Sequence, residues 1–134
     1  MSEENVELAL RAVHAWNDGG AEAILPYLDP EIEWHPPRES MEPGTYHGHA
    51  GVGDYLGRQA EVFSGAPRAQ PVDVIDVDVE RVIAVNRLIA RGEVLGTEID
   101  VEWAWLIKVR DGKGIEVWTF TDRAQALEAA GLSE

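Results

Sequence analysis

The sequence predicts an α+β fold in which one curved antiparallel sheet carries helices across its concave face. Apolar residues recur at helical spacing in the first half of the chain, strand-like alternation fills most of the second half, and no linker or repeat intervenes. A curved sheet partly covered by helices encloses a cone-shaped cavity, and small-molecule sites concentrate in such concavities. With 134 residues, the chain is expected to be a single domain, residues 1–134, that buries a core without disulfides.

Helical patterns occupy three stretches of the first half. Residues 6–16 form an apolar stripe that follows several acidic residues and ends at Asp18-Gly19-Gly20. A short second stripe over residues 21–28 is closed by Asp29-Pro30, because proline cannot continue a helix. The third stretch, residues 52–63, contains glycines that each weaken a helix by about 1 kcal/mol relative to alanine. This third helix therefore depends on packing.

Extended patterns begin before the third helix and dominate after it. Residues 32–35 predict a brief strand, and residues 38–48 predict a long exposed loop. Residues 72–79 and 82–91 predict two more strands. The alternation in the first of these slips at Val74-Ile75, which indicates a bulge.

A hairpin over residues 98–122 is the most strongly patterned part of the chain. One alternation phase is apolar and aromatic from Ile99 to Val109, and Asp111-Gly112 supplies the turn. Residues 123–130 then predict a terminal helix, with Asp122 and Gln125 forming a capping box.

The composition argues against several classes of function. Twenty-five Asp and Glu against eleven Lys and Arg give a formal charge of -14, which repels phosphate backbones and anionic lipid headgroups. Neither nucleic acid nor a membrane is therefore an expected partner. The absence of cysteine excludes thiol catalysis and thiolate metal sites. Without an apolar signal core or a long apolar run, a cytoplasmic location is expected.

Five phrases, in their order along the chain, resemble the SnoaL-like polyketide cyclase family of the nuclear-transport-factor-two-like superfamily. They are Trp16-Asn17-Asp18-Gly19, Ile32-Glu33-Trp34-His35-Pro36, Tyr46-His47-Gly48-His49, Arg110-Asp111-Gly112-Lys113, and Asp122-Arg123-Ala124 with Ala126-Leu127. The resemblance spans residues 6–132. It implies a cone-shaped barrel whose curved mixed or antiparallel sheet wraps over three helices from the N-terminal half, with a deep pocket between them. It also implies a homodimer formed through the sheet, and an activity that needs no cofactor.

Members of this family include cyclases, isomerases, epoxide hydrolases, dehydratases and binding proteins, so the resemblance alone does not give the function. In the ketosteroid isomerase relatives the general base falls on His35, whose imidazole titrates near neutral pH. The donors of those isomerases fall near Ala12 and on or beside Trp103 and Trp105, so that mechanism is not expected. The Asp, Arg, Asp array of the epoxide hydrolases is also missing. The polyketide cyclase relatives use an acid near the end of the last strand, and Asp122 is the closest match.

His35 and Asp122 are therefore the candidate catalytic residues, and each has a structural alternative. His35 could be a strand-end histidine satisfied by a backbone carbonyl. Asp122 could serve only as a helix N-cap, a contribution of about 1 kcal/mol. His47 and His49 point the same way in an extended segment and could bind a metal, but a third ligand is not evident, so no metal site is predicted.

Aromatic residues are expected to line the pocket, although they could equally fill a core. Buried indole N–H groups need partners, which a polar or aromatic ligand would supply. Asn86 and Arg87 lie on opposite faces of their strand, and whichever faces inward is a polar contact. The expected lining residues are Trp16, Trp34, Tyr46, His49, Tyr55, Asn86, Trp103, Trp105, Trp118 and Phe120.

Two main hypotheses follow for the function. The first is a cofactor-independent cyclase, isomerase or hydrolase in which His35 moves a proton on a small, apolar carbonyl or hydroxylated compound. The second is a non-catalytic protein that binds a small ligand in the same pocket. A third possibility is a partner interface on the outer face of the sheet, where Glu98, Asp100 and Glu102 would crowd like charges.

Overall fold

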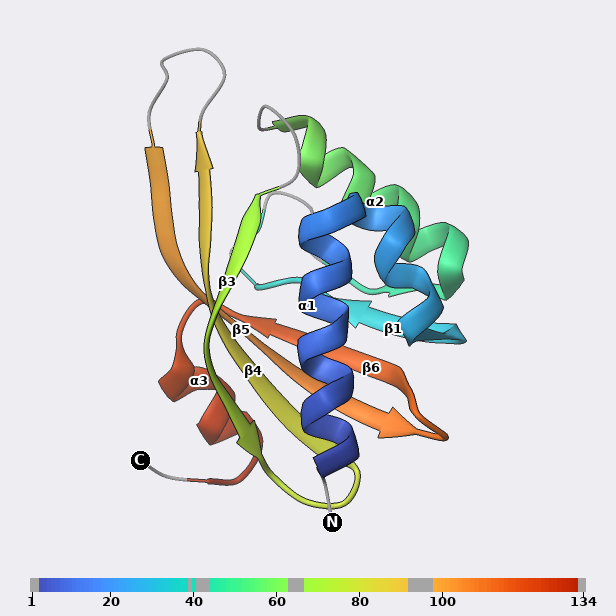
Figure 1. The fold of residues 1–134 in the computed structure, drawn as a ribbon, viewed down its shortest axis with the longest axis vertical. Helices are drawn as coiled ribbons and strands as arrows, with labels where there is room; N and C mark the ends of the chain where they lie inside the picture. Colours follow the sequence, from blue (N-terminus) through green and yellow to red (C-terminus); the bar gives the residue numbers. More distant parts are fainter. Residues whose placement is uncertain (1–2, 39, 41–43, 63–66, 92–97, 133–134) are drawn as a thin grey trace.

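One mixed sheet of six strands organises the fold (Figure 1). The computed structural model of the chain describes residues 3–38, 40, 44–62, 67–91 and 98–132. The strands lie in the order β2-β1-β6-β5-β4-β3, and β1 pairs with β6 in parallel while the other pairs are antiparallel. They are β1 (Leu28–His35), β2 (Tyr46–His47), β3 (Arg68–Asp76), β4 (Arg81–Arg91), β5 (Glu98–Arg110) and β6 (Lys113–Phe120). The predicted α+β fold with a mixed sheet is confirmed, and the sheet is not closed.

Three α-helices flank this sheet. They are α1 (Glu3–Ile24), α2 (Gly48–Val62) and α3 (Arg123–Ala129), and a short 3-10 helix, η1 (Leu25–Tyr27), follows α1. Gly20 has φ 73° and ψ -148°, so α1 is kinked at the residue where the sequence predicted the first helix to end. No helix in the described part of the chain combines the length and apolar character that crossing a membrane requires.

Both faces of the sheet are covered. Helices α1 and α2 lie across one face, and α3 lies against the other (Figure 1). Strand β3 shows the consequence, because Val74 packs into the cluster below α1 while its neighbour Ile75 packs into the cluster below α3. The prediction of a bulge at Val74-Ile75 is therefore wrong. Two apolar residues follow each other because both faces of the strand are covered, and not because the strand register shifts there. The register shift of β3 lies instead between Pro71 and Asp73.

The hairpin of β5 and β6 has the turn that the sequence predicted. Asp111 and Gly112 have φ values of 51° and 76°, the left-handed pair that a tight two-residue turn needs. Beyond the turn, the register shifts by one residue, so Val109 pairs with Gly114 but Lys108 pairs with Glu116. Ile115 is the extra residue. Because a shift of one residue reverses which face a side chain occupies, this bulge decides which residues of β6 face α1 and α2.

A polar clamp joins α1 to the edge strand β3. Asn17 donates from Nδ2 to the carbonyl oxygen of Ala69 at 2.7 Å, and its Oδ1 accepts from the Ala69 N–H at 2.8 Å. One residue earlier, the Trp16 indole donates to the carbonyl oxygen of Pro67 at 2.6 Å. These contacts satisfy backbone groups at an otherwise unpaired sheet edge, where open N–H and C=O groups invite aggregation.

Replacing Asn17 with alanine should lower the free energy of unfolding by about 1–3 kcal/mol, because both backbone groups of Ala69 lose their partner. Ala69 is fully buried, so water cannot easily take the place of the amide. Urea unfolding followed by circular dichroism measures the change. Asp18→Ala on the exposed side of the same helix is the control and should shift stability by less than about 0.5 kcal/mol. An equal effect of the two substitutions would contradict the clamp.

Candidate functional site

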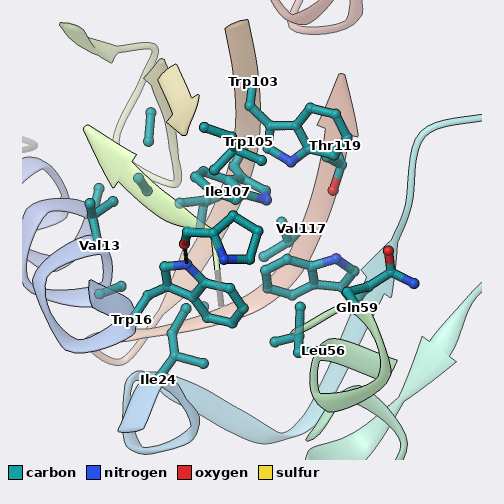
Figure 2. A pocket seen from close by; sticks show the side chains of 18 of the residues that line it. Val13, Trp16, Ile24, Leu56, Gln59, Trp103, Trp105, Ile107, Val117 and Thr119 are labelled. Atoms are coloured by element: carbon teal, nitrogen blue, oxygen red, sulfur yellow. Dashed lines mark hydrogen bonds between the residues drawn. The ribbon is translucent and has the colours of Figure 1, made fainter. Parts of the chain in front are cut away.

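A cavity of about 310 Å³ lies between the sheet and the two helices α1 and α2 (Figure 2). Its volume is at the small end of the range for small-molecule sites. The wall is formed by apolar and aromatic side chains, and none of the described residues that line it carries a carboxylate, an imidazole, an ammonium or a guanidinium group. The polar side chains on the wall are those of Tyr27, Tyr55, Gln59 and Thr119, together with the indole N–H groups.

Each element presents one face to the cavity. Helix α1 contributes Ala9, Ala12, Val13 and Trp16, which follow the spacing of one helical face. Strand β5 contributes every second residue from Ile99 to Ile107, as alternation requires. Figure 2 shows the sheet residues facing side chains from the helices, with Trp103, Trp105, Val117 and Thr119 on one side and Val13, Trp16, Ile24, Leu56 and Gln59 on the other.

Tryptophans dominate the wall. Four of the five in the chain line the cavity, namely Trp16, Trp34, Trp103 and Trp105. The rings of Trp34 and Trp105 meet edge to face with centroids 6.5 Å apart, an arrangement that aromatic pairs favour. With Tyr55, these tryptophans account for half of the lining residues that the sequence predicted.

Trp118 and Phe120 lie on the opposite face of the sheet from the expected cavity wall. The bulge at Ile115 is the cause, because it pairs Trp105 with Thr119 and not with Trp118. Trp118 and Phe120 instead pack against the cluster under α3. The residue of β6 that faces the cavity beside Trp105 is therefore Thr119.

Three further residues that were expected on the wall occupy other positions. Tyr46 stacks on Tyr55 with centroids 4.5 Å apart, outside the cavity. The Nε2 atom of His49 lies 2.8 Å from the Leu28 carbonyl oxygen, which ties α2 to β1. Asn86 belongs to the cavity face of β4, between the wall residues Ala84 and Leu88, but it is only 1% exposed.

His35 faces away from the cavity. Its neighbour Trp34 takes the cavity side, and successive residues of a strand point to opposite faces. The imidazole stacks on Trp118, 5.3 Å between centroids and 3° between planes, and its Nδ1 lies 3.1 Å from the Thr45 hydroxyl oxygen. His35 thus lines a second, more open hollow of about 880 Å³ next to α3.

Asp122 is placed by the helix that follows it. Its side chain accepts a hydrogen bond from the Gln125 N–H at 2.8 Å, so it is the N-cap of α3. It lines neither the cavity nor the hollow that contains His35. The structure does not bring the two candidate catalytic residues together, and their catalytic roles stay predictions.

Among the described residues, one group has the spacing of metal ligands. The ligand atoms of Glu33, His35 and Glu116 lie within 4.8 Å of one another on the outer face of β1 and β6. Imidazole with carboxylates is a donor set that divalent transition metals accept. His47 and His49, the possible metal-binding pair in the sequence, have different partners in the structure. His49 contacts the Leu28 carbonyl oxygen, and His47 Nε2 lies 3.8 Å from Glu31 Oε2.

Tyr27, Gln59 and Thr119 are the polar wall residues that were not expected from the sequence. Gln59 follows Val52, Tyr55 and Leu56 at the spacing of one helical face, which is a signal the sequence does carry. Thr119 could not be found in this way, because its orientation depends on the bulge at Ile115.

Comparisons with known proteins agree with this architecture. A family model described as a SnoaL-like domain matches residues 9–117. The crystal structure of TerC co-crystallised with polyporic acid is 25% identical, with a TM-score of 0.78 over 96% of this chain and 99% of that one. A protein from Jannaschia sp. CCS1, provisionally named a SnoaL-like polyketide cyclase, is 23% identical, with a TM-score of 0.74 over 95% and 90% of the two chains.

A third structure resembles the chain in fold alone. It comes from Catenulispora acidiphila DSM 44928, has a ketosteroid isomerase-like fold and holds trimethylamine; it is 13% identical, with a TM-score of 0.75 over 94% and 93% of the two chains. A search of curated proteins found no match. Because the family model covers most of the sequence, the chain belongs to the family of SnoaL-like domains.

Proposed function

We propose that this protein binds a small, largely apolar molecule in the cavity between the sheet and helices α1 and α2, and does not transform it by acid–base catalysis. One observation carries the proposal: the described wall is apolar and aromatic, with no side chain that titrates near neutral pH. A proton-transfer enzyme needs a base within reach of its substrate. Solved structures of similar fold that hold small molecules support binding as the shared capacity.

The enzymatic alternative would have to act at the other face of the sheet. It is favoured by one observation, that the Nε2 atom of His35 is buried and has no hydrogen-bond partner among the described residues. His35 lines the outer hollow, and the ligand atoms of Glu33, His35 and Glu116 lie within 4.8 Å of one another. The homodimer expected from the family resemblance would also concern this outer side of the sheet.

Equilibrium dialysis with naphthalene derivatives tests the binding proposal, because a fused two-ring compound matches the size and apolar character of the cavity. Wild-type protein should bind about one equivalent of 2-methylnaphthalene or 2-naphthol with a Kd in the micromolar range. His35→Ala should leave both Kd values within about twofold, since the imidazole lies across the sheet.

The two candidate functions predict opposite outcomes for that variant. If His35→Ala abolished binding while thermal unfolding stayed normal, the ligand site would be the outer hollow. Absence of saturable binding of either naphthalene by the wild type would contradict the cavity proposal itself.

A further inference from the structure

Unpartnered polar atoms are concentrated on the face of the sheet that bears the cavity. Among the described residues, four buried side-chain nitrogen or oxygen atoms have no hydrogen-bond partner, and three of them belong to Asn86, Trp105 and Thr119. These residues sit on the cavity side of the adjacent strands β4, β5 and β6. Buried polar groups are nearly always satisfied in folded proteins, so three exceptions on one patch call for an occupant.

The pairing of the strands brings the three side chains together. Trp105 is directly opposite Thr119 across β5 and β6, and Asn86 is opposite Trp103, two residues along β5 from Trp105. Directly paired side chains lie about 5 Å apart and diagonal ones about 7–8 Å, so one small functional group can reach Trp105 together with Thr119, or Trp105 together with Asn86. Asn86 and Thr119 themselves are separated by the width of β5. Figure 2 shows Trp103, Trp105 and Thr119 gathered on the sheet side of the cavity.

Two of the side chains that carry these atoms are almost fully buried. Asn86 is 1% exposed and Thr119 is 5% exposed. The Asn86 amide donates only weakly, from Nδ2 to the Ala84 carbonyl oxygen at 3.4 Å, and its Oδ1 stays without a donor. The patch thus consists of three groups. The Trp105 N–H can only donate a hydrogen bond, Asn86 Oδ1 can only accept one, and the Thr119 hydroxyl can do both.

We infer that this patch is the recognition site for a hydroxyl group on an otherwise apolar ring compound, an alcohol or a phenol. A hydroxyl oxygen can accept from Trp105 Nε1 while its proton goes to Asn86 Oδ1 or Thr119 Oγ1. An ether or a ketone can accept from Trp105 Nε1 and from the Thr119 hydroxyl but has no proton for Asn86 Oδ1, and a hydrocarbon satisfies none of the three. The inference rests on the binding function proposed above and adds the polarity and position of the group that is bound.

Three naphthalenes of similar size separate these possibilities in equilibrium dialysis. 2-Naphthol can donate and accept, 2-methoxynaphthalene can only accept, and 2-methylnaphthalene can do neither. The wild type should bind 2-naphthol at least about tenfold more tightly than 2-methylnaphthalene, with 2-methoxynaphthalene between them. A purely apolar cavity would give the reverse order, because the hydrocarbon gains more from leaving water.

Thr119→Val removes the hydroxyl and keeps the shape of the side chain. It should weaken 2-naphthol binding by about tenfold and should not weaken 2-methylnaphthalene binding, because the new methyl group makes the wall more apolar. The melting temperature should stay equal or rise because an unsatisfied buried group is lost. Trp105→Phe should also weaken 2-naphthol binding. Thr45→Val makes the same chemical change on the opposite side of the sheet, beside His35, and should alter neither Kd.

The outcomes separate this inference from the proposed function. Equal or reversed affinities for 2-naphthol and 2-methylnaphthalene would keep the binding function and overturn the hydroxyl site. A preference for 2-naphthol that survives in both Thr119→Val and Trp105→Phe would also overturn it. Failure of all three compounds to bind would remove the proposed function together with the inference.

Discussion

Ile32→Ala is expected to lower the free energy of unfolding by about 2–5 kcal/mol, the largest effect on stability of any substitution considered for this chain. Ile32 is completely buried, and it belongs to the cluster that joins β1 to α2 through Val52, Tyr55 and Leu56. Truncation leaves a void between a strand and a helix that are each held in place by the other. A typical domain has only about 5–15 kcal/mol of stability in total, so the loss is a large fraction.

Urea or thermal unfolding measures this loss, and Ile32→Val provides the matched control at about 0.5–1.5 kcal/mol, because it removes one methyl group from the same site. Since Ile32 is two residues before Trp34 on the same side of β1, loosening this layer should also disturb the cavity wall. A loss below about 1 kcal/mol for the alanine variant would mean that the cluster collapses around the void and does not hold α2 in place.

The order of the main elements could be predicted from the sequence because each carries its own local signal. Two expectations are wrong: β1 begins at Leu28, inside the stretch 21–28 predicted as helical, and β2 lies inside the loop predicted for residues 38–48. The kink of α1 falls at Gly20, the turn of the hairpin falls at Asp111 and Gly112, and Asp122 caps α3 as its capping box predicts. These features depend on residues a few positions apart. Such short-range relations are what a single sequence expresses most directly.

Side-chain orientation on the strands was predictable only where the alternation is uninterrupted. Strand β5 runs without a break through Trp103 and Trp105, and both face the cavity as expected. In β6 the extra residue Ile115 reverses the phase, so Thr119 takes the place expected for Trp118. A single inserted residue in a ladder leaves no clear mark in the sequence, although its consequence is to exchange an indole for a hydroxyl at the site.

The expectation for His35 conflicts with strand geometry in a way that the sequence alone could have revealed. Trp34 and His35 are neighbours in one strand, so they cannot both face the same cavity. The choice of Trp34 for the wall follows from its burial, 4% exposed, in the cluster under α2. A comparison with relatives that matches sequence positions does not by itself settle on which face of a strand the matched residue lies.

The acidic residues on the outward face of β5 have structural partners that the sequence could not identify. Asp100 accepts from Arg87 Nε at 2.6 Å across β4 and β5, and Glu102 accepts from the Arg123 N–H at 2.6 Å at the start of α3. Glu102 therefore adds a carboxylate at a helix N-terminus, a favourable position for negative charge. These pairings depend on where α3 docks, which is a matter of tertiary packing.

The cavity exists because side chains of different size face each other across it. Large aromatic rings from β1 and β5 stand opposite small residues of α1, so the helix approaches the sheet without filling the space between them. Ala9 and Ala12 are the small residues on that helical face. A larger side chain on α1 is the most direct way to remove the cavity while leaving the sheet intact.

Ala12→Trp should therefore reduce the affinity for 2-methylnaphthalene and for 2-naphthol by at least about tenfold, equal to about 1.4 kcal/mol of binding free energy. The added indole occupies space that the ligand would need, on the helical side of the cavity and away from the patch of Asn86, Trp105 and Thr119. Both ligands should lose affinity alike, in contrast to Thr119→Val, which should affect only the hydroxylated one. Equilibrium dialysis measures both values, and circular dichroism verifies that the variant is folded.

His14→Trp is the matched control, because it adds an indole to the exposed side of the same helix. It should change neither affinity by more than about twofold. If the folded Ala12→Trp variant bound both naphthalenes as the wild type does, the ligand would not occupy the space between α1 and the sheet, and the cavity would be a packing defect of the fold. If only 2-naphthol lost affinity, the indole would have disturbed the polar patch and not filled the cavity.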